Sequence, residues 1–188
     1  MVRTGICLGA LLCGLTLAGC GSEQAAAGNG SVDTGHAQQS VAEALAGAGE
    51  LRHAARMMRA TGLDRTLGGV GTYTLFVPVD HAFGALPQLM RAQLESSEGR
   101  PQSVALMNLH IAPGYITRED IDDSIARTAG NAQIATLNGG RIDLGRQGDV
   151  VTLGRGADAA RIVGTPIAAR NGMIYPLDRF VTAAAAAD

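Results

Sequence analysis

The chain has 188 residues and carries 15 basic against 17 acidic residues, a net charge of −2. Every basic residue is an arginine, and the arginines are scattered instead of forming a basic run. With no Trp, three Phe and three Tyr, the sequence supports neither nucleic-acid binding nor an aromatic platform for bases or sugars, so no nucleic-acid partner is expected.

The first 19 residues have the pattern of a cleaved signal, not of a folded domain. An apolar run covers residues 6–17 after a short positive start. The run is too short to span a bilayer, which takes about 20 apolar residues, but it has the length of a signal-peptide core. It ends in Leu-Ala-Gly-Cys at 17–20, where two small residues and a cysteine follow a leucine. This lipobox pattern predicts a lipoprotein signal peptide over residues 1–19 and acyl chains on Cys20.

Acylation of Cys20 would make the membrane itself a partner of the protein. A buried methylene contributes about 0.8 kcal/mol, and stable anchoring takes more than one chain. Gly21, in place of an Asp, favours the outer membrane of a bacterial cell envelope, at its periplasmic face or at the cell surface. The alternative is an ordinary secretory signal that contains cysteines by chance. The two other cysteines lie inside the predicted signal peptide, so no disulfide, thiolate metal site or cofactor is expected in the mature domain.

Composition divides the rest of the chain into three parts. Residues 20–40 are small and polar without an apolar period, which predicts a flexible tether that begins with the lipidated cysteine. Residues 41–183 form a segment of roughly 140 residues, enough for one domain with a hydrophobic core. The Ala-rich residues 184–188 are expected to be a disordered tail.

Helical patterns dominate the first part of the domain. The stretch 51–60 has helical spacing, and Gly62 is a suitable stop. An aromatic and β-branched run at 73–79 predicts a buried strand, and Asp80 is expected to cap the helix after it. Thr117 opens a capping-box sequence in which Asp replaces the preferred Glu or Gln. The predicted helices cover 41–46, 51–60, 81–86, 88–94 and 102–110, with a further one after Thr117.

Strand patterns follow after residue 129. Asn138-Gly139 between two β-rich runs is a hairpin signal. Pro176 lacks the N–H that a ladder needs, which places its strand at a sheet edge or at a bulge. Helices followed by strands favour the α+β class over an alternating parallel α/β fold. The predicted strands cover 134–137, 141–144, 150–153, 160–167 and 173–181.

Three segments in this order resemble the fasciclin (FAS1) domain. Residues 74–83 read Thr-Leu-Phe-Val-Pro-Val-Asp-His-Ala-Phe, residues 106–115 read Leu-Met-Asn-Leu-His-Ile-Ala-Pro-Gly-Tyr, and residues 171–181 read Asn-Gly-Met-Ile-Tyr-Pro-Leu-Asp-Arg-Phe-Val. The family usually has Tyr-His in the second segment, where this chain has Leu109 before His110. The resemblance implies a wedge of two small β-sheets with helices packed around it. It also implies a non-catalytic adhesion or interaction role, with a protein or extracellular-matrix partner.

Four residues of these segments are candidates for an interaction motif or for fold support: Pro78, Asp80, His110 and Tyr115. His110 stands on an apolar helical stretch, where a core histidine bonded to the backbone is more common than a ligand. No two histidines have the i, i+4 spacing of a helical metal site. The acidic run 119–123 lacks the alternating ligands and central Gly of a calcium loop and suits the positive end of a helix dipole. Catalytic and metal sites are therefore not predicted.

Three functional hypotheses from different classes remain open. The first is a lipid-anchored interaction module. The second is a periplasmic enzyme or accessory protein in polymer or small-molecule turnover, and the third is a structural envelope protein without a specific ligand. A deep polar pocket with convergent His and carboxylate groups would favour the enzyme, whereas a broad, shallow apolar patch with a polar rim would favour the module.

Overall fold

The computed structural model describes residues 31–181, which fold around two four-stranded sheets. The central sheet has the order β2-β1-β8-β7 and the second sheet the order β3-β4-β5-β6. The strands are β1 (Tyr73–Pro78), β2 (Ile111–Pro113), β3 (Ala132–Ala135), β4 (Arg141–Gln147), β5 (Val150–Leu153), β6 (Ala160–Arg161), β7 (Ile167–Ala169) and β8 (Gly172–Leu177).

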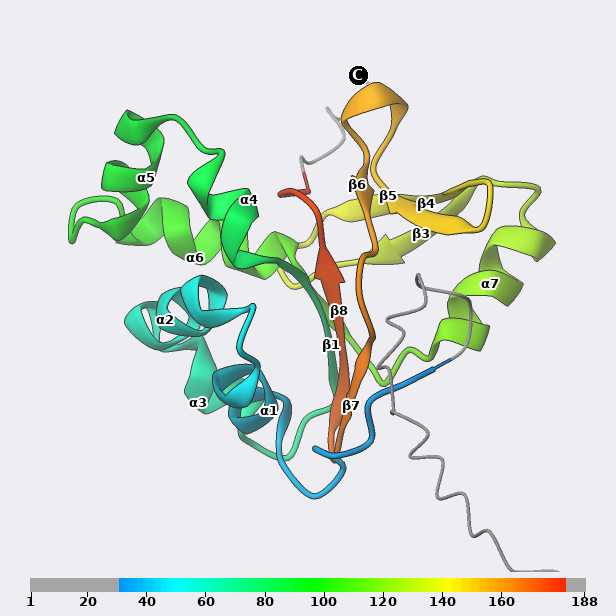
Figure 1. Cartoon of the computed structure of the whole chain (residues 1–188), viewed down its shortest axis with the longest axis horizontal. Coiled ribbons are helices and arrows are strands. Elements are labelled where there is room, and N and C mark those ends of the chain that lie inside the picture. Colours follow the sequence, from blue (N-terminus) through cyan, green and yellow to red (C-terminus); the bar gives the residue numbers. More distant parts are fainter. Residues whose placement is uncertain (1–30, 182–188) are drawn as a thin grey trace, which may run out of the picture.

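Seven α-helices accompany the sheets in the described range 31–181. Figure 1 shows α1 to α6 on one side of the central sheet, and the second sheet with α7 on the other. The helices are α1 (Val41–Gly47), α2 (Arg52–Thr61), α3 (Leu63–Leu67), α4 (Asp80–Gly84), α5 (Gln88–Glu95), α6 (Arg100–Leu109) and α7 (Arg118–Arg127). This arrangement confirms the predicted α+β class, with two small, mostly antiparallel sheets and helices packed around them.

The central sheet is buried on both faces. In β1, Leu75 and Val77 pack with the helices, whereas Phe76 points into the cluster shared with the second sheet and α7. In β8, Ile174 and Tyr175 divide in the same way between the two clusters. Because successive side chains of a strand point to opposite faces, both strands need apolar residues at nearly every position. The continuous apolar run of β1 is the sequence signal of this double burial.

The turn before β8 holds the helical side to the central sheet. β8 runs parallel to β1, with Gly172 opposite Tyr73, and a Cβ built on Gly172 would lie 1.6 Å from the carbonyl oxygen of Tyr73. The buried Asn171 beside it accepts the backbone N–H of Val41 at 2.8 Å and donates to the carbonyl oxygen of Leu67 at 2.9 Å. The Asn-Gly pair, interpreted from sequence as a turn, therefore also allows the close approach of two strands and fixes α1 and α3.

Two strand predictions differ from the structure. The predicted strand 160–167 is two strands in two sheets, because Gly164, with φ of 64°, and Pro166 turn the chain from β6 to β7. Pro176 is not on an edge strand, since β8 has β1 and β7 as neighbours. β7 pairs with β8 only as far as Ile174, and the Pro176 carbonyl accepts the N–H of Val163. The proline therefore lies beyond the β7 ladder, next to the chain segment that leads from β6 to β7.

Residues 31–40, which belong to the predicted tether 20–40, form backbone hydrogen bonds with the domain. Asp33 donates its backbone N–H to Pro166 and accepts that of Ala168, and the carbonyl of Gln39 accepts the N–H of Arg170. Backbone hydrogen bonds form without an apolar pattern in the sequence. The composition of this segment therefore does not predict them. The signal peptide, the first part of the tether with Cys20, and the tail 184–188 lie outside the described residues. Within residues 31–181, no helix combines the length and apolar character needed to cross a membrane.

Candidate functional site

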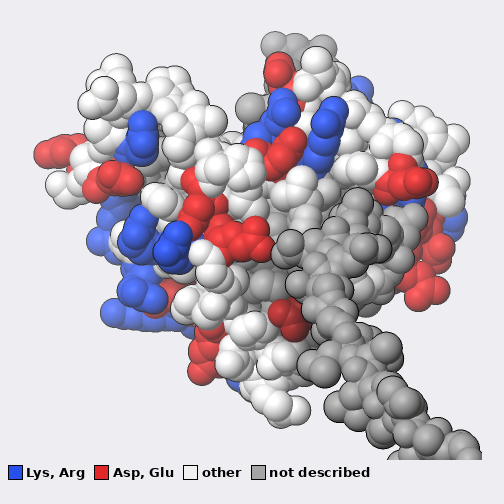
Figure 2. Space-filling view, in the orientation of Figure 1, with Lys and Arg blue, Asp and Glu red and all other residues white. Residues whose placement is uncertain are grey.

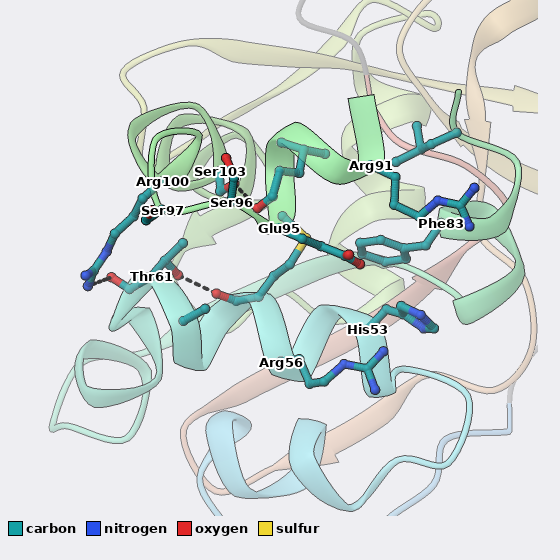
Figure 3. Close-up of a pocket in the computed structure, with 14 residues that line it drawn as sticks. His53, Arg56, Thr61, Phe83, Arg91, Glu95, Ser96, Ser97, Arg100 and Ser103 are labelled. Carbon is teal, nitrogen blue, oxygen red and sulfur yellow. Dashed lines mark hydrogen bonds between the residues drawn. The ribbon is translucent and has the colours of Figure 1, made fainter. Parts of the chain in front are cut away.

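A hollow on the helical side lies between α2, α4, α5 and α6, with a cavity volume of about 700 Å³ (Figure 3). Its apolar lining comes from Met57 and Ala60 of α2, Phe83 of α4, Leu86, and Leu94 of α5. Small-molecule sites commonly have volumes of about 300–1,000 Å³ and a mainly apolar lining with a few polar groups. We call this hollow the helical groove.

Three arginines line the helical groove: Arg56 of α2, Arg91 of α5 and Arg100 of α6. Figure 3 shows Arg100 at the opposite end of the groove from Arg56 and Arg91. Arg100 donates to the carbonyl oxygen of Thr61 at 3.5 Å. Within the described part of the chain, none of the three arginines has an acidic group within 4.0 Å. Glu95 is the one acidic residue in the lining.

Asp80 and His53 lie at the edge of this groove. The Asp80 carboxylate accepts the backbone N–H of His53 at 2.8 Å and lies 3.0 Å from its Nδ1, while the Nε of Arg52 donates to it at 3.1 Å. Burial acts to raise the pKa of Asp80, but the hydrogen bonds from His53 and Arg52 outweigh it and hold the pKa below its usual value. The His53 ring stacks on Phe83, with centroids 5.3 Å apart.

The prediction that Asp80 caps the helix after it is therefore wrong. No side chain caps α4, whose first helical residue is Asp80 itself. The carboxylate instead reaches back 27 residues in the sequence to the first turn of α2, where free N–H groups attract an anion. Sequence distance hid this bond, because a capping rule examines only the helix that follows.

His110 is fully buried at the end of α6. Its Nδ1 lies 2.8 Å from the Leu106 carbonyl, and its Nε2 accepts the backbone N–H of Val181 at 3.0 Å. The two bonds require the neutral ring with the proton on Nδ1. Burial lowers the pKa of His110 to about 4, against the smaller opposing effect of the Leu106 bond. Phe180 packs edge-on against the ring at 5.6 Å. These contacts place His110 in the core and away from solvent.

Pro78 and Tyr115 lie at opposite ends of β1. Pro78 is the buried last residue of that strand, whereas Tyr115 follows the end of β2, where Pro113 lies opposite Tyr73. Five residues of strand separate the two ends, or roughly 16 Å. The structure therefore does not gather the four candidate residues into one site. Tyr115 is 42% exposed. Its loop is fixed by Thr74, which donates to Gly114 at 2.9 Å.

The helical groove was not predicted from the sequence. Its residues come from four helices separated by loops, and each arginine by itself resembles an ordinary solvated side chain. The sequence of 88–95 contains Leu89, Met90 and Leu94, but only the structure shows that no residue of α5 is fully buried and that Leu94 is partly buried against the core.

The fold defines an α+β domain of two small sheets with helices packed around them. The fasciclin domain model matches residues 49–183. The chain belongs to the fasciclin family. It is 25% identical over 125 residues to protein sll1483 of Synechocystis, a match over 66% of this chain and 62% of that protein. Its fold is similar to that of a FAS1 domain pair from the insect cell adhesion molecule fasciclin I, with a TM-score of 0.68 and 15% identity, over 78% of this chain and 51% of that one.

Proposed function

We propose that this protein is a lipid-anchored component of a bacterial cell envelope whose fasciclin domain acts by contact with a protein or matrix partner and without catalysis. The observation that carries the interaction role is membership of the fasciclin family over residues 49–183, because this is a family of adhesion and interaction modules. The lipobox at residues 17–20 supports the anchor.

The hydrogen bonds of residues 31–40 to the domain limit the distance between the proposed lipid anchor and the domain. Ten residues, 21–30, lie between Cys20 and the described chain, and ten residues span at most about 36 Å. Figure 1 shows the described chain approaching β7 from the side of α7, away from α5. An anchored domain would thus stay close to the bilayer, with the helical side free to turn toward partners.

The surface of α5 suits contact with a partner. Leu89 is 82% exposed and Met90 49% exposed, and α5 has no buried residue. Exposed apolar side chains on a helix without a fully buried residue add hydrophobic area to an interface at little cost to the fold. We propose Leu89 and Met90 as part of the contact surface.

The rival enzyme role has one supporting observation. His53 lines the helical groove and is bonded to Asp80, as the imidazole of a general base is bonded to a carboxylate. That carboxylate is engaged by the first turn of α2 and by Arg52, which gives it a structural role. The interaction module therefore has the stronger support.

The anchor is tested by labelling the protein with radioactive palmitate in a bacterial host and by membrane fractionation. Cys20→Ala should abolish the label and release the protein from membranes. Cys13→Ala is the matched control, since it removes a cysteine of the predicted signal peptide and should leave both unchanged. Undiminished labelling of the Cys20→Ala protein would refute the anchor.

The contact surface is tested by cross-linking the anchored protein on intact cells and identifying the captured molecule. The double change Leu89→Gln and Met90→Gln should lower the yield of the captured partner at least severalfold. Val70→Gln is the control, because Val70 is fully exposed on the loop after α3. Equal losses in both variants would remove α5 from the proposal, and turnover of a substrate that depends on His53 would favour the enzyme.

A further inference from the structure

The helical groove combines an apolar lining with an excess of positive charge. We propose that it binds a small amphiphilic anion, an elongated apolar molecule of the fatty-acid class that ends in a carboxylate. The proposal concerns a ligand of the domain itself and does not depend on the anchor or on the adhesion role.

The apolar lining sets the body of the ligand. Met57, Phe83, Leu86 and Leu94 present side chains from three different segments to one hollow of about 700 Å³. Phe83 is held in place on both sides, by His53 stacked at 5.3 Å and by Phe180 packed edge-on at 4.8 Å. A fixed aromatic side wall with flexible Met and Leu around it suits a hydrocarbon chain, whose transfer from water contributes about 0.8 kcal/mol for each buried methylene.

The charges set the end group of the ligand. The lining holds three arginines and one glutamate, a local excess of two positive charges in a protein whose net charge is −2. The nearby Asp80 does not offset this excess, because Arg52 and His53 occupy its oxygens. Arg56 and Arg91 have no acidic partner within 4.0 Å in the described chain. A guanidinium matches a carboxylate in two parallel hydrogen bonds. An incoming carboxylate would supply the missing partner.

One wall of the groove is suited to admit a ligand. Helix α5, which contributes Arg91, Leu94 and Glu95, buries no residue and begins without a side-chain cap. Figure 3 shows Glu95 directed into the groove on the side of Phe83. Elements with few buried apolar contacts open at low free-energy cost. The hydrocarbon chain of the ligand can therefore enter the groove after a small displacement of α5. The negative charge of Glu95 then repels the carboxylate of the ligand.

The test titrates the full-length protein with dodecanoate below its micelle concentration, by calorimetry at pH 7.5. Methyl dodecanoate has the same chain without the charge and should bind at least tenfold more weakly. Arg56→Gln and Arg91→Gln should each weaken dodecanoate binding about tenfold, the usual effect of losing one charge-assisted bond. Glu95→Gln should tighten it severalfold. Arg59→Gln, on the same helix as Arg56 but outside the groove lining, should leave the affinity unchanged.

A blocking variant separates the groove from other apolar parts of the chain. Ala60 lines the groove at an exposed helical position, so Ala60→Trp fills the hollow while the fold, checked by thermal unfolding, is retained. Binding should be lost in Ala60→Trp. Binding equal to that of the original chain in this variant would overturn the proposal, as would equal affinity for acid and ester. An acidic peptide that binds at Arg56 and Arg91 while dodecanoate does not would also overturn it.

Discussion

The helical side of the domain, residues 41–110, and the strand side, residues 111–181, carry equally balanced charges. The first has six arginines and six acidic residues, and the second has eight of each. Their pairing differs. Among pairs within residues 31–181, five strand-side arginines lie within 4.0 Å of a carboxylate, whereas on the helical side only Arg52 does. Figure 2 shows basic side chains grouped at the left of the view, over the region of α2 and α3 in Figure 1.

The difference is that more arginines contact carboxylates on the strand side than on the helical side. Three of the strand-side pairs are local, within α7 or between adjacent residues, whereas Asp143 of β4 joins a separate segment through Arg155 at 2.7 Å. Arg146 of β4 likewise pairs with Asp122 of α7. The helical side is held instead by its apolar cluster and by polar bonds at its joint with the central sheet. Arginines that have no carboxylate partner are available to bind a ligand. For this reason we consider the helical groove as a binding site.

The largest expected effect tests the joint between the two sides. Asn171→Ala removes the bonds to Val41, Leu67 and Gly71 and leaves three backbone groups without partners. We expect a loss of about 4 kcal/mol in the free energy of unfolding, at about 1–3 kcal/mol for each orphaned group. Urea denaturation measures the loss. Hydrogen exchange should rise in α1 and α3 far more than in β4 and β5.

The matched control for this variant is Asn138→Ala. Asn138 accepts bonds from Thr136 and Gly140 within one exposed turn of the strand side, so its loss should cost less than about 1 kcal/mol. If Asn171→Ala raised exchange equally on both sides, the domain would unfold as one unit and the two sides would not differ in how they are held.

The next effect in size is the pH dependence that His110 imposes. With a pKa of about 4 in the folded state and about 6.5 when unfolded, the unfolded chain binds the proton first as pH falls. Stability is therefore complete above pH 6.5 and declines through the window down to pH 4, by about 3 kcal/mol. Urea midpoints at pH 7 and pH 4.5 measure the decline. His110→Gln removes this contribution, so an equal decline in that variant would contradict it.

These cases also show how far sequence determines the structure. Gly62 ends α2 with φ of 81°, and Thr117 forms its capping box with Asp120, because both signals act within a few residues. Asn171 was recognised only as a turn, since its partners lie 100 to 130 residues away. The helical groove was missed for the same reason. Local patterns predict elements, while sites arise from side chains that only the complete packing brings together.

A change of intermediate size in the free energy of unfolding is expected when a paired charge of the strand side is removed. The Asp143 side chain is 9% exposed and accepts bonds from Gln133 and from both Nε and Nη2 of Arg155. Asp143→Asn should lower the free energy of unfolding by about 1.5 kcal/mol, a value limited by the exposure of Arg155. The hydrogen bonds from Arg155 hold the pKa of Asp143 below its usual value, so the original chain loses this contribution as pH falls through that pKa. A variant as stable as the original chain would mean that strand-side pairs do not hold the fold.

The smallest effect is expected for Arg56→Gln on the helical side. Arg56 is an exposed residue of α2 with no acidic group within 4.0 Å in the described chain, and glutamine has a helix propensity similar to that of arginine. The free energy of unfolding should change by less than about 0.5 kcal/mol, as for surface substitutions elsewhere. A loss comparable to that of Asp143→Asn would mean that Arg56 is paired in solution. An arginine that stability does not require is free to serve recognition, so the same variant should retain the fold while it weakens dodecanoate binding.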